Sequence, residues 1–287
     1  MNVHSTAIIS KGAVLSDDVE IGPYAVIEDR VSIGRRVKIY AHAHILGHTS
    51  IGDDCQVHIG AVLGHAPQIR KASVQTGKLC VGNRNIFREY ATVHRSSKET
   101  TATVIGDDNY FMAFSHIAHD CNIGNNVTVC NGALIAGHAI VEDFAFISGN
   151  VTIHQFCRIG RYAMVGGLAR ISKDVPPYML VKGDSLVWAV NSVGLRRANF
   201  SLQSRIEIKK AFKLLYKSGL NVTQAAEKLA APGGSAELGC LVAFIRCSQR
   251  GICRHKQPAL GERLSGLWPN KLHQAYRLFQ NTQRQLI

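Results

Sequence analysis

Aliphatic or aromatic side chains recur at every sixth position over most of the chain between Ile9 and Ile171. The residue two places before each is almost always small or β-branched in the first run. A six-residue period fits neither the 3.6-residue period of a helix nor the alternation of a simple strand. It is typical of a parallel β-helix, in which each unit is a short strand followed by a corner. The repeating positions are Ile9, Leu15, Ile21, Ile27, Ile33, Ile39, Ile45, Ile51, Val57 and Leu63, then Val81, Phe87 and Val93, and then Ile105, Phe111, Ile117, Ile123, Val129, Ile135, Val141, Ile147, Ile153, Ile159, Val165 and Ile171.

The repeat also predicts which residues lie above one another. Three units of six residues close one triangular coil, so residues about 18 apart stack directly, about 4.8 Å apart like neighbouring strands. The apolar residue of each unit points into a narrow core. Polar residues on the outside of successive coils can therefore be assigned to columns from their numbers.

Two stretches interrupt the repeat, at residues 64–79 and near 95–102. Both are polar or lack the aliphatic position. We expect loops that leave the coil, and such loops commonly carry ligand contacts. They are candidate binding loops.

The pattern changes after the turn-forming residues 174–178. Apolar residues then recur at helical spacing, which predicts helices that cap the open end of the coil. The predicted helices cover residues 201–218, 222–230 and 237–247. The predicted organisation is a β-helix domain at 1–185, a helical domain at 186–254 and a basic tail of unknown role at 255–287.

A chain of 287 residues can bury a continuous core without disulfides or metal. The eight cysteines occur singly, with no CxxC pair, which indicates free thiols in a reducing compartment. The N-terminus has no basic segment followed by a long apolar run, and no long apolar stretch occurs elsewhere. We therefore expect neither a signal peptide nor a membrane span, and we expect a cytoplasmic location.

The formal net charge of +13 predicts an acidic partner. The basic residues gather in pairs and short clusters, notably Arg35 with Arg36, Arg196 with Arg197, and the lysines of 209–217. No RNA-binding, zinc-finger or helix-turn-helix signature accompanies them. A phosphorylated substrate or an acidic carrier protein explains the charge better than nucleic acid.

The first group among the 13 histidines belongs to the early coils. His42, His44, His48 and His58 fall on outward or corner positions of the repeat. Exposed structural or subunit-contact roles are the expected ones for such residues.

A second group of histidines converges in the later coils. By the stacking rule His119, Gly137 and Gln155 form one column, and His138 lies over Asp120. Histidine titrates near neutral pH and a neighbouring carboxylate fixes its tautomer, so His119 beside Asp120 is a candidate general base. Gly137 can present its backbone N–H to an oxyanion without a side chain in the way. A base that activates a substrate hydroxyl requires no serine or cysteine nucleophile.

Converging imidazoles on a β-helix could instead hold a zinc ion with an open coordination position. Against this, His116 and His119 face different ways, and His119 already has a carboxylate neighbour. A ladder of hydrogen-bonded surface histidines is a third interpretation of the cluster. The general base remains the leading hypothesis.

Five short strings, in this order, resemble the acyl-carrier-protein-dependent UDP-N-acetylglucosamine O-acyltransferases, the first enzymes of lipid A synthesis. The resemblance runs from the N-terminus to about Arg254. It implies a left-handed β-helix with a C-terminal helical domain, a homotrimer with active sites between subunits, and a cytoplasmic enzyme that needs no metal or other cofactor. The acyl donor would be carried on the phosphopantetheine of acyl carrier protein. The strings are HIAHDC at 116–121, AGH at 136–138, HQFC at 154–157, MVGG at 164–167 and DVPPY at 174–178.

The resemblance also implies roles for individual residues. His119 would remove the proton from the sugar 3-hydroxyl, Asp120 would orient it, and Gly137 would supply the oxyanion N–H. Arg196 and the cationic segment 205–217 would meet the acidic carrier, because a positive patch speeds encounter with a negative partner. The residues implied to contact the sugar, acyl group, nucleotide or phosphopantetheine are His94, His116, His138, His154, Gln155, Gln68, Lys71, Asn191 and Arg197.

Four positions depart from the family pattern and leave the exact substrates open. Ile69 stands where the family commonly has an acidic sugar contact, and Val193 and Ala198 replace a Glu and an Arg. Ser185 occupies a position linked to acyl length. The alternatives are transfer to another UDP-amino sugar, including N-acylation of a diamino sugar, a non-catalytic protein that binds carrier or sugar nucleotide, and a zinc hydratase on the same scaffold.

Overall fold

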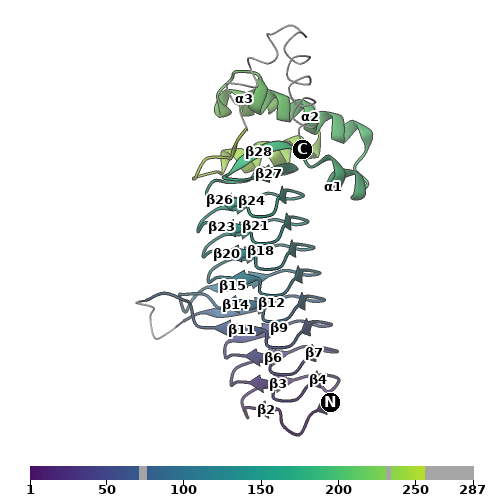
Figure 1. Ribbon diagram of the computed structural model, residues 1–287, viewed down its shortest axis with the longest axis vertical. Coiled ribbons are helices and arrows are strands. Elements are labelled where there is room, and N and C mark those ends of the chain that lie inside the picture. Colours follow the sequence, from purple (N-terminus) through teal and green to yellow (C-terminus); the bar gives the residue numbers. More distant parts are fainter. Residues whose placement is uncertain (71–75, 231–233, 256–287) are drawn as a thin grey trace, which may run out of the picture. The chain divides into compact units, whose positions relative to one another are not determined.

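Short strands form three sheets that close into a left-handed parallel β-helix (Figure 1). The computed structural model describes residues 1–70, 76–230 and 234–255. The chain visits the sheets, here named A, B and C, in that order, and each coil gives one strand to each sheet. The fold predicted from the six-residue repeat is confirmed.

The strands are mostly two residues long, which is the length that each six-residue unit leaves for a strand between corners. Sheet A contains β1 (Asn2–Val3), β4 (Glu20–Ile21), β7 (Lys38–Ile39), β10 (Gln56–Val57), β13 (Ile86–Phe87), β16 (Tyr110–Phe111), β19 (Thr128–Val129), β22 (Phe146–Ile147), β25 (Met164–Val165), β27 (Met179–Lys182), β28 (Leu186–Val190) and β29 (Arg254–His255). Sheet B contains β2 (Ile8–Ile9), β5 (Val26–Ile27), β8 (His44–Ile45), β11 (Val62–His65), β14 (Thr92–His94), β17 (His116–Ile117), β20 (Leu134–Ile135), β23 (Thr152–Ile153) and β26 (Arg170–Ile171). Sheet C contains β3 (Val14–Leu15), β6 (Ser32–Ile33), β9 (Thr49–Ile51), β12 (Lys78–Val81), β15 (Ala102–Ile105), β18 (Asn122–Ile123), β21 (Ile140–Val141) and β24 (Arg158–Ile159).

The recurring apolar residues fill the interior of the coil. From Ile21 to Ile171 every one of them is buried, whereas Ile9 and Leu15 near the N-terminal end are only partly buried. Phe87 stacks on Phe111 with ring centroids 4.8 Å apart. Burying one such side chain contributes roughly 1.5–3 kcal/mol, so the stack stabilises itself without cross-links. All eight cysteines are free thiols.

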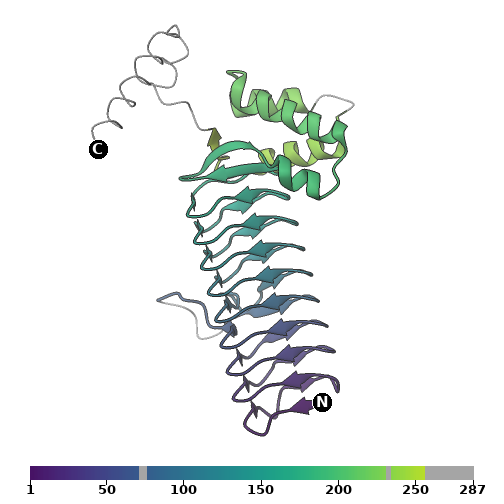
Figure 2. The same cartoon turned by 45° about the vertical axis from the view of Figure 1, so that its right-hand side comes forward.

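The strand register confirms the stacking rule. His116 pairs with Leu134 and Leu134 with Thr152, each 18 residues further on. Val62 instead pairs with Thr92, and Thr92 with His116, because extra residues leave the coil there. Figures 1 and 2 both show a segment that projects from the stack between β11 and β12, as predicted for the first interruption.

Two corners of the coil are important below. Corner BC is the turn from a sheet B strand to the next sheet C strand, and corner CA is the turn from sheet C to sheet A. Many residues at the third position of these corners adopt left-handed backbone angles, with φ of 60° at Asp108, Asp120 and His138. Aspartate tolerates this conformation better than most residues do.

The helical part follows the last coil. Residues 201–218, 222–230 and 237–247, predicted as helices, form α2 (Leu202–Lys217), α3 (Val222–Leu229) and α4 (Ala236–Arg246). Ser201 caps α2 by accepting the Ser204 N–H, and Asn221 with Gln224 forms a capping box on α3. No helix of the described residues is long and apolar enough to cross a membrane.

Two elements before α2 were not predicted. The strands β27 and β28 form an antiparallel hairpin, and the short helix α1 (Ser192–Arg197) follows it. The boundary predicted at residue 185 falls in the turn of this hairpin. Residues Met1–Arg254 form one compact unit. Apart from His255, the predicted tail lies outside the described residues.

Candidate active site

The predicted histidine cluster lies on corner BC of three successive coils. His119 and Asp120 follow β17, Gly137 and His138 follow β20, and Phe156 follows β23. The N–H of His138 donates to the His119 carbonyl and the N–H of Phe156 to the Gly137 carbonyl, both at 3.1 Å. The columns predicted from residue numbers are therefore present.

His119 and Asp120 form a hydrogen-bonded pair. Nδ1 of His119 lies 2.7 Å from Oδ2 of Asp120, and the two side chains are 16% and 9% exposed. An ionised carboxylate only accepts hydrogen bonds, so Nδ1 carries the proton and donates it. Nε2 is left with its lone pair, which is the arrangement that a general base requires.

Hydroxyl groups surround the Asp120 carboxylate. Ser97 Oγ donates to Oδ2 at 2.6 Å, Ser97 N–H donates to it at 3.2 Å, and Ser96 Oγ donates to Oδ1. Burial by itself raises the pKa of Asp120, but the hydrogen bonds from Ser96, Ser97 and His119 outweigh it and hold that pKa well below its usual range. Asp120 is therefore an anion throughout the physiological pH range.

Gly137 lies against the edge of the His119 ring. A Cβ at this position would come within 2.7 Å of Cε1 and 2.8 Å of Nε2, which is closer than real contacts allow. Within the described part of the chain the Gly137 N–H donates no hydrogen bond. A free N–H beside the base can stabilise an oxyanion there.

His138 lies next to both members of the pair. Its Nε2 lies 3.7 Å from Oδ2 of Asp120, and its ring is perpendicular to that of His119 at 5.3 Å between centroids. The other face of His138 stacks on Phe156 at 4.6 Å. The exposed Phe156 was not predicted as part of the site.

His116 and His94 extend the site along sheet B. Nδ1 of His116 lies 2.7 Å from Oγ1 of Thr92, and the His94 ring is perpendicular to that of His116 at 5.0 Å. Burial, with a smaller effect of His119, lowers the pKa of His116. Burial also lowers the pKa of His94 to about 4, with smaller effects of His116, His65 and His119. Both rings are neutral near pH 7.

Some predicted contact residues do not join this cluster within one chain. Asn191 caps α1 by accepting the Gly194 N–H at 3.1 Å, and its amide donates to the Tyr162 carbonyl on corner CA at 2.9 Å. Arg197, at the end of α1, is exposed. These two residues therefore lie by a different corner from His119.

The remaining predicted contacts within the described residues lie on the surface. His154 and Gln155 are exposed in corner BC after β23, with Gln155 in the column of His119, and Gln68 is exposed in the first loop. Lys71 lies outside the described residues.

Sequence reasoning missed Ser96, Ser97 and Thr103. Ser96 and Thr103 are fully buried, and the Thr103 hydroxyl accepts the Asp120 N–H at 2.8 Å. The one signal for them was the interruption of the repeat near residues 95–102.

The zinc hypothesis can be tested against the donor set. Ligand atoms of His119, Asp120 and His138 lie within 4.8 Å of one another. However, the Asp120 oxygens already accept hydrogen bonds from Ser96 and Ser97. A cation would have to displace these donors and the His119 N–H, so the site fits a hydrogen-bonded base better than a metal centre.

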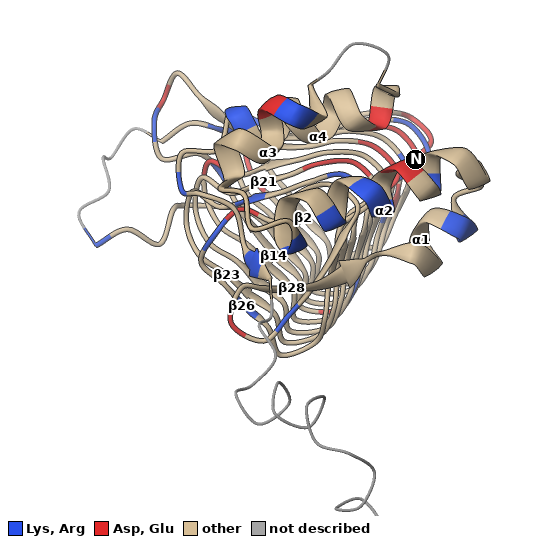
Figure 3. Cartoon of the chain, turned by 90° about the horizontal axis from the view of Figure 1, so that it is seen from above, with Lys and Arg blue, Asp and Glu red and all other residues tan. Residues whose placement is uncertain are grey.

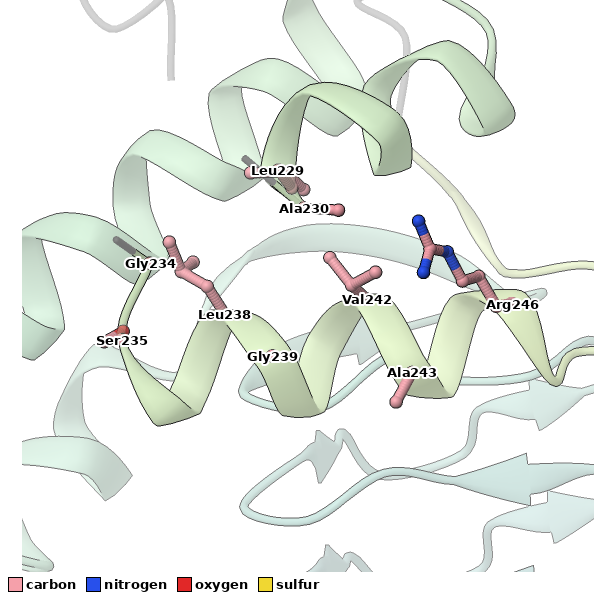
Figure 4. Close-up of a pocket in the computed structure, with 9 residues that line it drawn as sticks. All are labelled: Leu229, Ala230, Gly234, Ser235, Leu238, Gly239, Val242, Ala243 and Arg246. Atoms are coloured by element: carbon pink, nitrogen blue, oxygen red, sulfur yellow. The ribbon is translucent and has the colours of Figure 1, made fainter. Parts of the chain in front are cut away.

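Two hollows define the space around the site and in the helical part. A cavity of about 430 Å³ adjoins His138 and Phe156 and extends to Arg158 and Arg250. A separate hollow of about 330 Å³ lies between α3 and α4 (Figure 4) and contains none of the predicted site residues. The first hollow borders the cluster only at His138 and Phe156, and His119 does not line it.

Two family models match the chain. The bacterial transferase hexapeptide model, with six repeats, matches residues 12–47 and 102–137. The model of the second domain of UDP-N-acetylglucosamine O-acyltransferase matches residues 174–253. One model covers repeats of the coil and the other covers the hairpin and the helices.

Similar proteins match over nearly their whole length. The acyl-(acyl-carrier-protein)–UDP-N-acetylglucosamine O-acyltransferase of Thermodesulfovibrio yellowstonii is 44% identical over 255 residues, which are 88% of this chain and 99% of the relative. The enzyme of that name from Herminiimonas arsenicoxydans is 39% identical over 259 residues, with coverage of 88% and 99%. The structure of the UDP-N-acetylglucosamine acyltransferase of Bacteroides fragilis has a TM-score of 0.85 at 39% identity, covering 88% of this chain and 100% of that one. These matches do not favour a zinc hydratase or a protein that only binds, and the chain belongs to the acyl-(acyl-carrier-protein)–UDP-N-acetylglucosamine O-acyltransferase family.

Proposed function

We propose that this protein transfers a (3R)-hydroxyacyl group from acyl carrier protein to the 3-hydroxyl of UDP-N-acetylglucosamine, the first step of lipid A biosynthesis. The observation that carries the proposal is the 2.7 Å contact of His119 Nδ1 with an anionic Asp120, beneath the free N–H of Gly137. The names of the similar proteins support the substrates.

The geometry suggests the order of proton and bond changes. His119 Nε2 takes the proton of the sugar hydroxyl as its oxygen attacks the thioester carbonyl, and the Gly137 N–H donates to the resulting oxyanion. The C–S bond then breaks, the new ester forms, and the imidazolium returns the proton to the phosphopantetheine thiolate. Asp120 stabilises the imidazolium between the two steps without becoming protonated. No metal or other cofactor is required in this scheme.

The remaining cleft residues would orient the substrates. His116, His138, His154 and Gln155 line the approach to His119 and would contact the sugar or acyl group. His94, Gln68, Lys71, Asn191 and Arg197 would contact the sugar nucleotide or the phosphopantetheine. The ring contacts of His138 with His119 and of His116 with His94 support this assignment, because they place these side chains in one group around the pair.

The basic surface of α1 and α2 would bind the acidic carrier. Arg196 and Arg197 end α1, and α2 carries five basic residues against the single acidic Glu207. Figure 3 shows the basic positions, in blue, distributed along these two helices. Complementary charge accelerates such encounters, and high salt should slow them. The five basic residues are Arg205, Lys209, Lys210, Lys213 and Lys217.

A homotrimer with active sites between subunits agrees with the separation of the contact residues. Asn191 lies by corner CA and His119 on corner BC, so residues of both kinds would meet only across a subunit boundary. Exposed aromatic residues offer an apolar contact surface, since Tyr90 and Phe114 are 52% and 62% exposed and stack on each other. Free thiols at all eight cysteines support a cytoplasmic location.

The test is transfer of a labelled 3-hydroxyacyl group from carrier protein to UDP-N-acetylglucosamine, with the wild type and His119→Ala assayed side by side. General-base catalysis contributes typically 10²–10⁴-fold, so the variant should lose about that factor in kcat/KM. Circular dichroism and size-exclusion chromatography should show unchanged folding and assembly. Full turnover by His119→Ala would reject the base assignment, and no turnover by the wild type would reject this acceptor.

A further inference from the structure

Corner BC is irregular directly below Asp120. In the coils above, the corner N–H donates to the carbonyl one coil below, as from His138 to His119 at 3.1 Å. The Asp120 N–H donates instead to Thr103 Oγ1 at 2.8 Å. The reason is that the chain of the coil below leaves the stack after β14 and returns at β15. The loop of residues 95–101 therefore occupies the place of a regular corner.

The loop fills that place with hydrogen-bond donors. Ser96 Oγ, Ser97 Oγ and Ser97 N–H all donate to the Asp120 carboxylate, and Thr101 Oγ1 approaches it at 3.4 Å. Ser96 is fully buried, so its hydroxyl does not exchange this bond for one with water. Within the described residues, no lysine or arginine pairs with Asp120.

Neutral donors have an advantage over a cation at this position. Hydroxyl groups stabilise the carboxylate and restrict its rotation, as an arginine would. An arginine so close to His119 would also disfavour the imidazolium that forms during transfer, because like charges repel. Hydroxyls hold the anion without this penalty, and they leave Oδ2 aimed at Nδ1 of His119.

We propose that Ser96 and Ser97 are positioning residues of the transfer reaction, whose hydroxyls fix the Asp120 carboxylate in the orientation that accepts the His119 Nδ1–H. The inference rests on the proposed role of His119 as the base, and it adds which side chains hold the carboxylate that orients His119. The second interruption of the repeat then has a function, which is to deliver these two hydroxyls.

The proposal predicts a specific kinetic pattern. In Ser97→Ala the carboxylate loses one restraint, so kcat should fall about tenfold while KM changes less than about twofold. A less well aligned carboxylate also stabilises the imidazolium less, so the acid limb of the kcat/KM profile should move to lower pH. The titratable groups that face His119 are Asp120, His94, His116 and His138, and the variant leaves them in place.

The controls separate positioning from packing. Ser97→Thr keeps a hydroxyl and should restore most of the loss. Ser248→Ala removes a hydroxyl that donates to the buried Asp174 carboxylate at 2.7 Å, outside the site, and should leave both kcat and the acid limb unchanged. Ser96→Ala should act like Ser97→Ala, but Ser97 is half-buried and is therefore the safer variant for folding.

A second readout needs no turnover. Diethyl pyrocarbonate modifies neutral imidazole, so the rate of His119 modification against pH, followed by peptide mass spectrometry of the full-length protein, reports its protonation directly. The midpoint should move to lower pH in Ser97→Ala and not in Ser248→Ala. Unchanged midpoints in both Ser96→Ala and Ser97→Ala would overturn the inference, even if the wild type proved inactive on the proposed substrates. An inactive wild type with a shifted midpoint would reject the proposed function alone.

Discussion

Asp120 at corner BC and Asp108 at corner CA have the same place within a corner and very different surroundings. Both are at the third position of a corner and have φ of 60°. The Asp108 carboxylate pairs with the Arg84 guanidinium at 2.7 and 2.8 Å and is 37% exposed. The Asp120 carboxylate is 9% exposed and accepts hydrogen bonds from serines and from His119. The backbone conformation is the same, so the difference comes from the neighbours one coil below, which are Arg84 for Asp108 and the serines of 95–101 for Asp120.

The two corners show how a repeat acquires chemistry. At corner CA the third residues of successive coils stack regularly, so Arg36 forms an exposed ion pair with Asp54 and Arg84 forms one with Asp108. Exposed pairs of this kind stabilise a protein very little. At corner BC the loop of residues 95–101 replaces one regular corner, and its hydroxyls bind the buried Asp120 carboxylate that accepts a hydrogen bond from His119. The repeat builds the scaffold, and the pair of His119 and Asp120 lies where the repeat is interrupted.

The largest effect should come from filling the space over His119. Gly137→Ala would place a Cβ within 2.8 Å of Nε2, so the ring must turn away from the oxyanion site. Displacements of about 1 Å can cost about 100-fold, and we expect a loss of this order in kcat/KM. Gly149→Ala is the matched control, since its Cβ would meet only the Asn131 carbonyl at 3.4 Å. Equal kinetics for the two variants would remove Gly137 from the mechanism.

A second prediction concerns how burial of the neutral His94 ring, on sheet B, makes the free energy of unfolding depend on pH. Burial lowers the pKa of His94 to about 4, so the folded protein binds a proton there less readily than the unfolded chain does. Stability should therefore fall as the pH decreases from about 6.5 to about 4, by up to about 3 kcal/mol in the free energy of unfolding. Below about pH 4 His94 is protonated in both the folded and the unfolded protein, so this decrease in stability is complete.

The measurement for His94 is the free energy of urea unfolding of wild type minus that of His94→Gln, across this pH window. Taking the difference removes contributions that both proteins share, including those of the carboxylates. A difference that stays flat from pH 6.5 to 4 would show that His94 is not buried as a neutral ring.

Sequence-based prediction succeeds for the regular repeat and fails for its interruption, and the reason is physical. The six-residue period follows from strand and corner geometry, so it predicts the buried positions and the column of His119, Gly137 and Gln155. The pair of His119 and Asp120 is adjacent in sequence and needs no further folding information. These features could be predicted because they obey the repeat.

Features outside the repeat could not be predicted in this way. Ser96 and Ser97 reach Asp120 through a loop with no period, and 23 or more residues separate them from it. Phe156 occupies an ordinary corner position, and only the stacking on His138 gives it a place in the site. The hairpin of β27 and β28 begins directly after a proline-rich turn, where neither helical nor six-residue spacing continues.

The smallest effect should come from the regular corner. Arg84→Ala removes the ion pairs with Asp107 and Asp108, but the Arg84 side chain is 52% exposed, so solvent replaces most of what is lost. We expect a melting temperature within about 2 °C of the wild type and unchanged kcat/KM. Salt should narrow even this difference, because exposed charges are screened. If Arg84→Ala instead reduced turnover as Ser97→Ala is expected to, the two corners would be mechanically coupled, and the placement of function at the interruption of the repeat would be wrong.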